Sequence, residues 1–577
     1  MKAVSKALEA EWSSIVWSEI QTKVIKLQTK IYEASKSGNK PLAVKLQKTL
    51  ISSYSARLVA VRRVTQENKG KCTAGIDGVK SLNPQQRIEL AEKLRLDGKS
   101  SPLRRVEIPE PGKKEKRPLG IPTIEDRAKQ ALAKLALEPE WEALFEPNSY
   151  GFRPGRSCHD AIEAIELSIR KTPKYLIDAD LKGCFDNIDR ETLIQKLKTF
   201  PDMEKQIRAW LKSGVLVGDV FHKTVSGTPQ GAVISPLLAN IALHGFENYI
   251  SSEFPVRKTR IGQPKGKMKE YCEARVIRYA DDFVIIHEEE EVIKAALEKT
   301  KEWMTKIGLS LNEQKTKICH SLKEYEGEKP GFDFLGFHIQ SFTIGKNRAG
   351  KKTNGEPLGM VTKVLPSDKS IKQFQSHLKA LLNKGQSQEP AQMIERLNWF
   401  IRGWGNYFKS GSHSHEVFSK IQHSLYKVYL NWGRKKFSQK GDGYICSRIF
   451  FKSKESSWNF GWKEGNHLYL VEMLYSFEYK HYIKVQGTKS PYDGDWVYWI
   501  TRRGDHPLTP KDIRFGLKTQ KGRCSNCQQL FTIEDYIEVH HIDGNRNNNK
   551  RSNKTLVHLY CHDEIHRRNA GSNTDSI

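Results

Sequence analysis

The sequence predicts a multidomain α/β protein, and three observations support that fold class. The chain has 577 residues, which is too many for a single hydrophobic core. Apolar residues recur at helical spacing near the start of the chain and again over about 366–435, which predicts two helical regions. Between them, over about 96–345, helix-like stretches alternate with short runs of β-branched and aromatic residues, as expected for a sheet covered by helices.

Composition limits the classes of partner. There are 95 Lys and Arg residues against 67 Asp and Glu, so the net charge is +28 and the surface should attract polyanions. Nucleic acid is the leading partner, with an anionic membrane or simple solubility as alternatives. No apolar run approaches the roughly 20 residues that span a bilayer, so we expect no membrane partner. Without a secretory signal, and with mostly isolated cysteines, the chain is expected to be cytoplasmic or nucleoid-associated, or organellar if its source is eukaryotic.

Residues 1–95 are expected to form a basic helical extension. Apolar side chains recur at helical spacing with basic residues between them, as in Val24, Leu27 and Ile31. A loop rich in turn residues follows at 68–78, before the mixed α/β region begins.

The mixed region contains two adjacent acids, Asp281 and Asp282, between two strand-like runs, which predicts a hairpin with carboxylates at its tip. Neighbouring like charges need a counter-charge, and hard oxygen ligands suit Mg²⁺. A solvated acidic turn is the alternative. Upstream, Asp178 and Asp180 end another apolar strand on one face, and either could supply the third carboxylate that two-metal nucleotidyl transfer requires.

These blocks, in this order, resemble the reverse transcriptases encoded by group II introns. The resemblance rests on the segments 180–186 (DLKGCFD), 227–237 (GTPQGAVISPL) and 279–282 (YADD), supported by 117–122, 150–157, 311–317 and 334–337. It implies a right-hand polymerase whose fingers and palm, with an α+β palm sheet, occupy residues 96–345. It also implies that Asp180, Asp281 and Asp282 are the catalytic Mg²⁺ ligands, whereas Asp178, Asp186 and Asp189 have supporting roles.

The same resemblance implies four contacts to the incoming dNTP. Phe185 would exclude ribonucleotides at the sugar 2′ position, and Gln230 would pack on the nucleotide and template base. Arg117 would bind the triphosphate through charge-assisted hydrogen bonds. Lys315 would assist pyrophosphate release, with a solvated lysine at a helix end as the alternative. The segment before Arg117 departs from the family because Glu110 replaces a basic residue; Lys113, Lys114 or Lys116 would then take its role.

Residues 346–440 resemble the family's helical thumb, domain X, with 397–408 as the most characteristic piece. The resemblance implies that this region grips intron RNA as a maturase. Residues 441–510 mix Trp, Tyr, Lys and Arg, which fits either a DNA-binding segment or a small β-rich core. Residues 569–577 are expected to form a disordered tail.

The region 511–568 contains two pairs of ligands with the same spacing, Cys524 with Cys527 and His558 with Cys561. Four such ligands suit a structural, tetrahedral Zn²⁺ that stabilises a unit too small for a large core. Chance placement of the thiols is the alternative.

The same unit resembles the HNH, or ββα-metal, nuclease module. The resemblance implies that His540, His562 and His566 bind a divalent ion, which could be Mg²⁺, Mn²⁺ or Zn²⁺. It assigns His541 as the general base and Asn553 as the residue that orients it. The alternative is an inactive zinc-binding fold that only binds DNA.

Taken together, the resemblances imply a multifunctional group II intron-encoded protein. It would act as an RNA-directed DNA polymerase, as a splicing maturase bound to its intron RNA, and as an endonuclease that nicks the second strand of a double-stranded DNA target to prime reverse transcription. The alternatives are an RNA-binding maturase with little polymerase activity and a reverse transcriptase adopted by its host.

Overall fold

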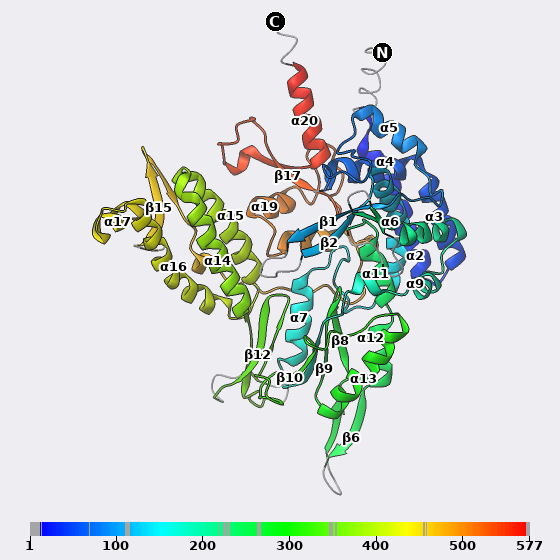
Figure 1. Ribbon diagram of the computed structural model, residues 1–577, viewed down its shortest axis with the longest axis horizontal. Coiled ribbons are helices and arrows are strands. Elements are labelled where there is room, and N and C mark those ends of the chain that lie inside the picture. Colours follow the sequence, from blue (N-terminus) through cyan, green and yellow to red (C-terminus); the bar gives the residue numbers. More distant parts are fainter. Residues whose placement is uncertain are drawn as a thin grey trace.

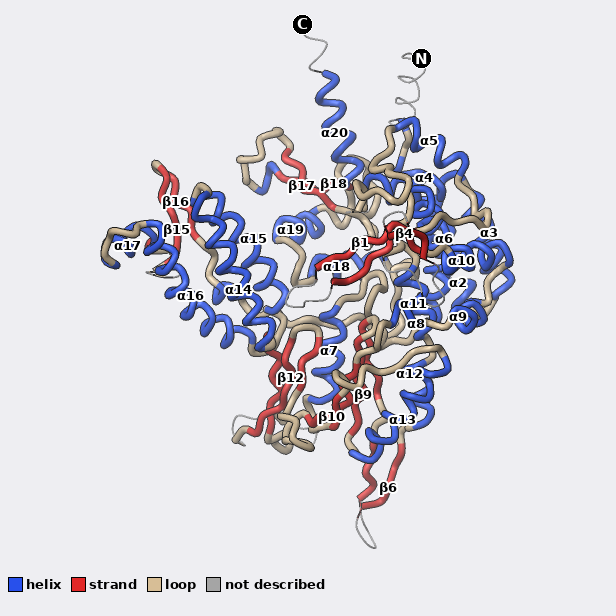
Figure 2. Tube along the Cα trace, viewed as in Figure 1, coloured by secondary structure: helices blue, strands red, loops and turns tan. Residues whose placement is uncertain are grey.

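The computed structural model describes residues 12–572 except 13, 69, 110–115, 218–219, 223–226, 228–230, 262–266, 346–349, 352–354, 454–455 and 457. Figure 1 shows the N-terminal helices on one side and the helical region after residue 366 on the other, with a mixed α/β body between and below them. Figure 2 shows that the strands form several separate small sheets. No helix among the described residues is long and apolar enough to cross a membrane.

The N-terminal region is helical, as predicted. Asn39 and Asn83 cap two of its helices by accepting hydrogen bonds from backbone N–H groups in the first turn. Val24 and Ile31 are buried in the same core as Leu132 and Ala136 of α6 (Ile124–Leu144), a helix of the mixed α/β region, so the N-terminal helices pack against that region. The N-terminal helices are α2 (Trp17–Lys36), α3 (Lys40–Ser52), α4 (Tyr54–Arg62) and α5 (Pro84–Lys93).

A four-stranded sheet of order β2-β1-β4-β5 lies beside these helices. Its first two strands pair antiparallel, whereas β1 and β4 pair in parallel. The strands are β1 (Leu103–Pro109), β2 (Lys116–Ile121), β4 (Val215–Val217) and β5 (Val220–His222). Further helices in this part of the chain are α8 (Cys184–Asn187), α9 (Arg190–Leu197), α10 (Pro201–Lys212) and α11 (Ser235–Leu243). A separate two-stranded hairpin consists of β6 (Arg257–Ile261) and β7 (Lys267–Tyr271).

The expected palm is a four-stranded antiparallel sheet of order β10-β3-β9-β8. Helices cover both of its faces, because alternate residues of its strands belong to two different cores: Ile285 packs with α12 and α13, and Val284 packs with α7. Burial on both sides explains why these strands are continuous apolar runs. The elements are α7 (Cys158–Ile169), β3 (Tyr175–Ala179), α12 (Phe246–Glu253), β8 (Arg275–Tyr279), β9 (Asp282–His287), α13 (Glu290–Lys306) and β10 (Lys317–His320).

A small sheet crosses the domain boundary that the sequence predicts at 345/346. In it β12 (Phe337–Thr343) pairs with both β11 (Phe332–Phe334) and β13 (Met360–Pro366). The polar, glycine-containing stretch between β12 and β13 therefore joins two strands of one sheet. A hairpin loop and an interdomain linker share this composition, so composition alone does not distinguish them.

The predicted helical region begins after β13. Its three helices bury Phe374, Leu397 and Phe418 in one core, whereas Trp399 is 69% exposed. The segment after residue 440 extends this core, because the rings of Tyr429 and Phe460 stack 4.3 Å apart. The elements are α14 (Asp368–Lys384), α15 (Pro390–Phe408), α16 (Ser414–Lys436), α17 (Asp442–Ile449), β14 (Phe450–Phe451), β15 (Asn459–Glu464) and β16 (His467–Leu470).

The C-terminal unit has a β-β-α arrangement in which β17 pairs antiparallel with β18 and α20 follows directly. Helix α20 continues to Ser572, four residues into the predicted tail, and residues 573–577 lie outside the described residues. The elements are α18 (Trp496–Asp505), α19 (Lys511–Thr519), β17 (Ile537–His541), β18 (Lys554–His558) and α20 (Leu559–Ser572).

Candidate functional site

The paired acids lie at the tip of the β8–β9 hairpin, as predicted. Tyr279 pairs with Asp282, so Ala280 and Asp281 form the two-residue turn, and Ala280 adopts a left-handed φ of 60°. Asp180 directly follows β3, whose last residue, Ala179, pairs with Phe283. The fold therefore brings Asp180 and the hairpin tip to the same edge of the sheet.

The acids influence one another electrostatically. Burial and the carboxylates of Asp281 and Asp180 raise the pKa of Asp282 to about 7, with Lys315 opposing the shift. Burial and the carboxylate of Asp282 likewise raise the pKa of Asp178 to about 7. A divalent cation would relieve this repulsion, so the donor set fits Mg²⁺. The ligand atoms of Asp180, Asp281 and Asp282 are not among the described clusters that lie within 4.8 Å of one another.

Lys315 lies beside this edge. Its ammonium group donates a hydrogen bond to the Asp180 carboxylate. Backbone contacts fix the surrounding segment, because the Asn312 N–H donates to the Asp180 carbonyl at 2.8 Å and Leu311 bridges Leu181. The predicted lysine therefore faces the acids instead of solvent alone.

Two residues that sequence reasoning did not assign hold the hairpin tip. Arg278 is 4% exposed and donates to the carbonyl of Ala280 at 3.1 Å and to the hydroxyl of Ser149 at 2.7 Å. Gly151 approaches so closely that a Cβ there would lie 2.2 Å from the backbone nitrogen of Ala280. The sequence could have indicated Arg278, because it is a charged residue inside a largely apolar strand. It could not have indicated Gly151, because the role of this glycine depends on its contact with Ala280, which is distant in the sequence.

The predicted dNTP contacts are only partly within the described residues. Phe185 lies on α8, 7% exposed, with its ring edge-on to Phe152 at 6.1 Å. A Cβ on Gly227 would lie 2.3 Å from the Phe185 carbonyl, so this glycine allows the 227–237 segment to approach α8.

Of the other residues predicted near the nucleotide, the structure describes Arg117 and Lys116, both on β2. Arg117 belongs to this strand and pairs with Ile108, and Lys116 lies 3.9 Å from the carboxylate of Glu107. Gln230, Lys113 and Lys114 lie outside the described residues. Arg117 and Lys116 therefore lie on one strand of the antiparallel β1–β2 hairpin.

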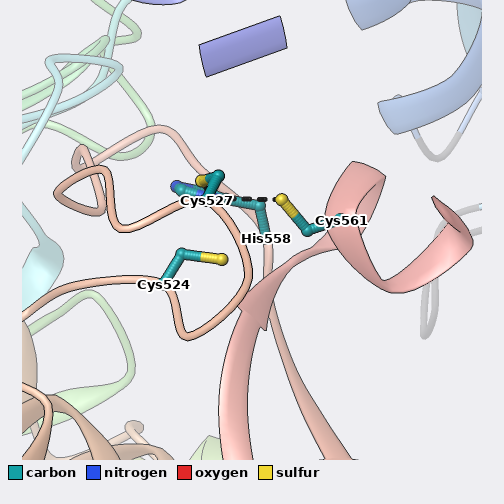
Figure 3. A group of neighbouring side chains, drawn as sticks. All are labelled: Cys524, Cys527, His558 and Cys561. Carbon is teal, nitrogen blue, oxygen red and sulfur yellow. Dashed lines mark hydrogen bonds between the residues drawn. The ribbon is translucent and has the colours of Figure 1, made fainter. Parts of the chain in front are cut away.

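The four predicted zinc ligands form a cluster with their ligand atoms within 4.8 Å of one another. Figure 3 shows Cys524 and Cys527 on a loop facing His558 at the end of β18 and Cys561 in the first turn of α20. The Nδ1 atom of His558 lies 3.4 Å from Sγ of Cys527 and 3.9 Å from Sγ of Cys561. Three thiols and one imidazole around one point suit tetrahedral Zn²⁺.

A second cluster contains His540 on β17 and His562 and His566 on α20. The Nε2 atoms of His562 and His566 lie 3.1 Å apart, as residues four apart on a helix allow. Burial and the neighbouring imidazoles lower the pKa of His540 and of His562, which favours the neutral form that binds metal. Cys561 and His562 are adjacent in α20, so this helix serves both clusters.

The residues predicted as base and orienter lie next to this cluster. His541 ends β17, and its Nε2 is a buried atom for which the described residues provide no hydrogen-bond partner. Asn553 acts on the segment after the base: its amide donates to Asp543 at 2.8 Å, its carbonyl oxygen accepts from the Asp543 N–H at 3.0 Å, and its backbone carbonyl accepts from Ile542. These contacts of Asn553 fix the loop that follows His541.

Three families match consecutive parts of the chain. Residues 12–94 match the N-terminal domain of reverse transcriptase, and residues 108–339 match reverse transcriptase (RNA-dependent DNA polymerase). Residues 371–450 match the group II intron maturase-specific domain, ten residues beyond the end predicted for the helical thumb. That extension agrees with the core shared by α16 and the strands after it.

Similar proteins cover most of the chain. The group II intron-encoded protein LtrA of Lactococcus lactis subsp. cremoris is 30% identical over 551 residues, covering 83% of this chain and 87% of LtrA. Protein YkfC of Escherichia coli K12 is 33% identical over 49% of this chain and 80% of its own length. Maturase-like protein 1 of Euglena gracilis is 24% identical over 77% and 86%, respectively. The resemblance predicted from the motifs is thereby confirmed, and the chain belongs to the group II intron-encoded reverse transcriptase and maturase family.

Proposed function

We propose that this protein is an RNA-directed DNA polymerase and splicing maturase that also carries a DNA endonuclease. The observation that carries the proposal is the presence, on one chain of this family, of two chemically distinct sites: acids at one edge of the β3–β9–β8 sheet and a histidine cluster on a β-β-α unit. Each site has the donor groups that its reaction requires.

In the polymerase site, Asp180, Asp281 and Asp282 would hold Mg²⁺. When bound, the ions would activate the primer 3′ hydroxyl and neutralise charge on the dNTP triphosphate. Arg278 and Gly151 fix the hairpin tip that carries two of the acids, and Lys315 supplies a positive charge beside Asp180. Phe185 would press on the sugar, and Arg117 and Gln230 would contact the nucleotide.

In the endonuclease site, His540, His562 and His566 would hold one divalent ion, which could be Mg²⁺, Mn²⁺ or Zn²⁺. His541 would accept a proton from the attacking water, since a neutral imidazole is an effective base near pH 7. Asn553 would keep the loop after His541 in place. A structural Zn²⁺ at Cys524, Cys527, His558 and Cys561 would fix the start of α20 and so position two of the histidines.

These activities combine into one reaction sequence. The maturase region would bind intron RNA and assist its splicing, and the resulting ribonucleoprotein would engage a double-stranded DNA target. The endonuclease would nick the second strand, and the polymerase would extend the new 3′ end by copying the RNA. The net charge of +28 supports binding to both nucleic acids.

The polymerase assignment is tested by primer extension on an RNA template with dNTPs and Mg²⁺. Asp281→Asn combined with Asp282→Asn should reduce synthesis below detection, because Asn cannot supply the charge that holds the ions. Asp178→Asn is the matched control: it removes a carboxylate from the neighbouring strand β3 that the resemblance does not assign as a metal ligand, and it should retain synthesis. Synthesis that survives the double substitution would refute the assignment.

The endonuclease assignment is tested with ribonucleoprotein and a labelled DNA target. His541→Ala should slow second-strand nicking about 10²–10⁴-fold, the usual loss for a missing general base, while synthesis from a ready-made primer continues. His222→Ala, which removes an exposed histidine on β5, is the control and should nick normally. Undiminished nicking by His541→Ala would exclude its role as base.

A further inference from the structure

The C-terminal zinc cluster contacts the N-terminal helices. Figure 1 shows the base of α20 beside the N-terminal helices, although the two segments lie at opposite ends of the sequence. The side-chain amide of Gln21 on α2 donates a hydrogen bond of 2.8 Å to the carboxylate of Asp535, 514 residues away in the sequence. The interface therefore includes Asp535, which lies beside the predicted zinc ligand His558.

His558 has two different partners at its two ring nitrogens. Nδ1 faces the thiols of Cys527 and Cys561, and Nε2 lies 3.4 Å from Oδ2 of Asp535. A carboxylate behind the distal nitrogen of a metal-bound histidine fixes the tautomer and the ring orientation and increases ligand basicity. Asp535 occupies this place in the structure.

Asp535 is itself held from two directions. Its side chain is 7% exposed; Oδ2 accepts from the Thr532 N–H at 2.6 Å, and Oδ1 accepts from the Gln21 amide. On its other side, Gln21 accepts a hydrogen bond from the guanidinium of Arg62 at 2.8 Å. A continuous chain of contacts thus runs from α4 through α2 to the distal nitrogen of His558.

Two further contacts fix the same interface. The guanidinium of Arg62 lies between the rings of Trp17 and Tyr560, 4.5 and 4.4 Å from their centroids. Arg63 forms a 2.6 Å ion pair with Glu534, the residue before Asp535. Tyr560 lies between His558 and Cys561 in the sequence. The stacking of Arg62 on its ring therefore also constrains the segment that carries those two predicted zinc ligands.

We propose that Asp535 is a positioning residue of the zinc site and that Gln21 makes helix α2 part of that site, so zinc binding and docking of the N-terminal helices on the C-terminal unit are coupled. The proposal rests on zinc being the ion at the Cys₃His cluster. By linkage, an ion that binds only the docked form stabilises the docked interface, and loss of the interface weakens ion binding by the same factor.

The first test measures zinc affinity of the full-length protein by competition with a chromophoric chelator. Asp535→Asn keeps the shape but removes the charge, and it should weaken zinc binding about 10–100-fold. Gln21→Ala should weaken it in the same direction by a smaller factor. Gln28→Ala is the matched control: it removes a buried glutamine from the same helix, where the amide contacts the Leu135 carbonyl of α6 and not the zinc unit.

The second test measures hydrogen exchange of α2 with and without zinc. Chelation of wild-type protein should increase exchange in α2, as should Cys524→Ser, whereas α13, remote from the interface, should be unaffected. In the Co²⁺-substituted protein, Asp535→Asn should shift the visible absorption bands, because the orientation of His558 changes.

The outcomes separate the two hypotheses. The proposed coupling would be overturned if Asp535→Asn and Gln21→Ala both bind zinc with wild-type affinity. It would also be overturned if the hydrogen-exchange rate of α2 is the same with and without zinc. Either result would leave the zinc assignment itself intact. Purified protein that contains and binds no zinc would instead overturn the zinc assignment itself. Weaker binding in Asp535→Asn and Gln21→Ala, with wild-type binding in Gln28→Ala, is the result that supports the coupling.

Discussion

At the tip of the β8–β9 hairpin, individual residues control the charge and the backbone position of the acids. Burial, together with the carboxylates of Asp281 and Asp180, raises the pKa of the half-buried Asp282 to about 7. The guanidinium of Arg278 donates to the turn carbonyl of Ala280 and to the hydroxyl of Ser149. These contacts fix the backbone of the turn that carries Asp281 and Asp282.

Gly151 gives a sharp test of this rigidity. Gly151→Ala would place a Cβ 2.2 Å from the backbone nitrogen of Ala280, so the turn must shift. We expect DNA synthesis to fall by at least about tenfold and the free energy of unfolding to fall by about 1–3 kcal/mol, the usual cost of overpacking. Primer extension and denaturant unfolding measure the two effects.

The control is Gly443→Ala, where the new Cβ meets nothing within 4 Å. It should leave synthesis unchanged and should not lower the free energy of unfolding, because Ala is favoured over Gly in a helix such as α17. Wild-type synthesis by Gly151→Ala would mean that the position of the turn does not limit the reaction.

At the scale of elements, helix α7 connects the palm sheet to the C-terminal half of the chain. Its N-terminal Asp160 accepts hydrogen bonds from the Val485 N–H at 2.7 Å and from Tyr482 at 3.1 Å. Farther along the helix, burial raises the pKa of Glu163 and of Glu166 to about 7 each. The helix thus carries carboxyl groups that hold protons in the folded protein at pH values where an unfolded chain would release them.

This helix predicts an unusual dependence of stability on pH. Both carboxyl pKa values are higher in the folded state than the ordinary value of 4.5, so between about pH 5 and 7 the folded state binds more protons than the unfolded state. The free energy of unfolding should therefore decrease as pH rises through this window, by at most about 1 kcal/mol per pH unit for each group. Urea unfolding at several pH values measures the slope.

Neutral replacements provide the comparison. Glu163→Gln together with Glu166→Gln should flatten the slope, whereas Glu298→Gln, at an exposed position on α13, should not change it. An equally steep slope in the double variant would show that other groups cause the dependence.

At the scale of the whole molecule, charge and long-range docking dominate. The chain has a net charge of +28, and basic side chains end the long helix α16 on the thumb side (Figure 1). Among the described residues, the ammonium groups of Lys435 and Lys436 donate to uncharged partners, the Asn383 side chain and the Gln386 carbonyl. These ammonium groups are suited to neutralising phosphates.

Nucleic-acid binding should therefore depend steeply on salt. Between 50 and 200 mM salt we expect the affinity for structured RNA to fall on the order of 10³-fold or more. Each phosphate contact releases counterions from the RNA, and this release is less favourable at higher salt. Lys435→Gln with Lys436→Gln should reduce the log–log salt slope by about 2, one for each lost phosphate contact. Filter binding over a salt series measures both effects.

Lys299→Gln with Lys301→Gln provides the matched charge change, because these lysines on α13 already pair with Glu302 and Glu298. It should leave the slope nearly unchanged. Equal slopes for the two double variants would exclude a specific phosphate contact at the end of α16.

The sequence by itself determined the local features of this protein. Strands around Asp281 and Asp282, helices in the N-terminal and thumb regions, and the spacing of Cys524 with Cys527 and of His562 with His566 follow from periodicity and from ligand separation, which are properties of neighbouring residues. The order of the motif blocks was sufficient to identify the family, and the comparisons confirmed it.

Only the tertiary structure decided the arrangements that depend on contacts distant in sequence. The approach of Gly151 to Ala280, the β12–β13 pairing across the expected boundary at 345/346, and the contact between Gln21 and Asp535 all join segments that local patterns treat as independent. The residue pattern left Asp178 and Asp180 open on one strand face, and the family resemblance chose Asp180. The structure adds that Lys315 donates to the Asp180 carboxylate and that, after burial and the Asp282 and Asp333 carboxylates, the charge of Asp180 also raises the pKa of Asp178. Packing and charge in three dimensions, and not spacing along the chain, set these relations.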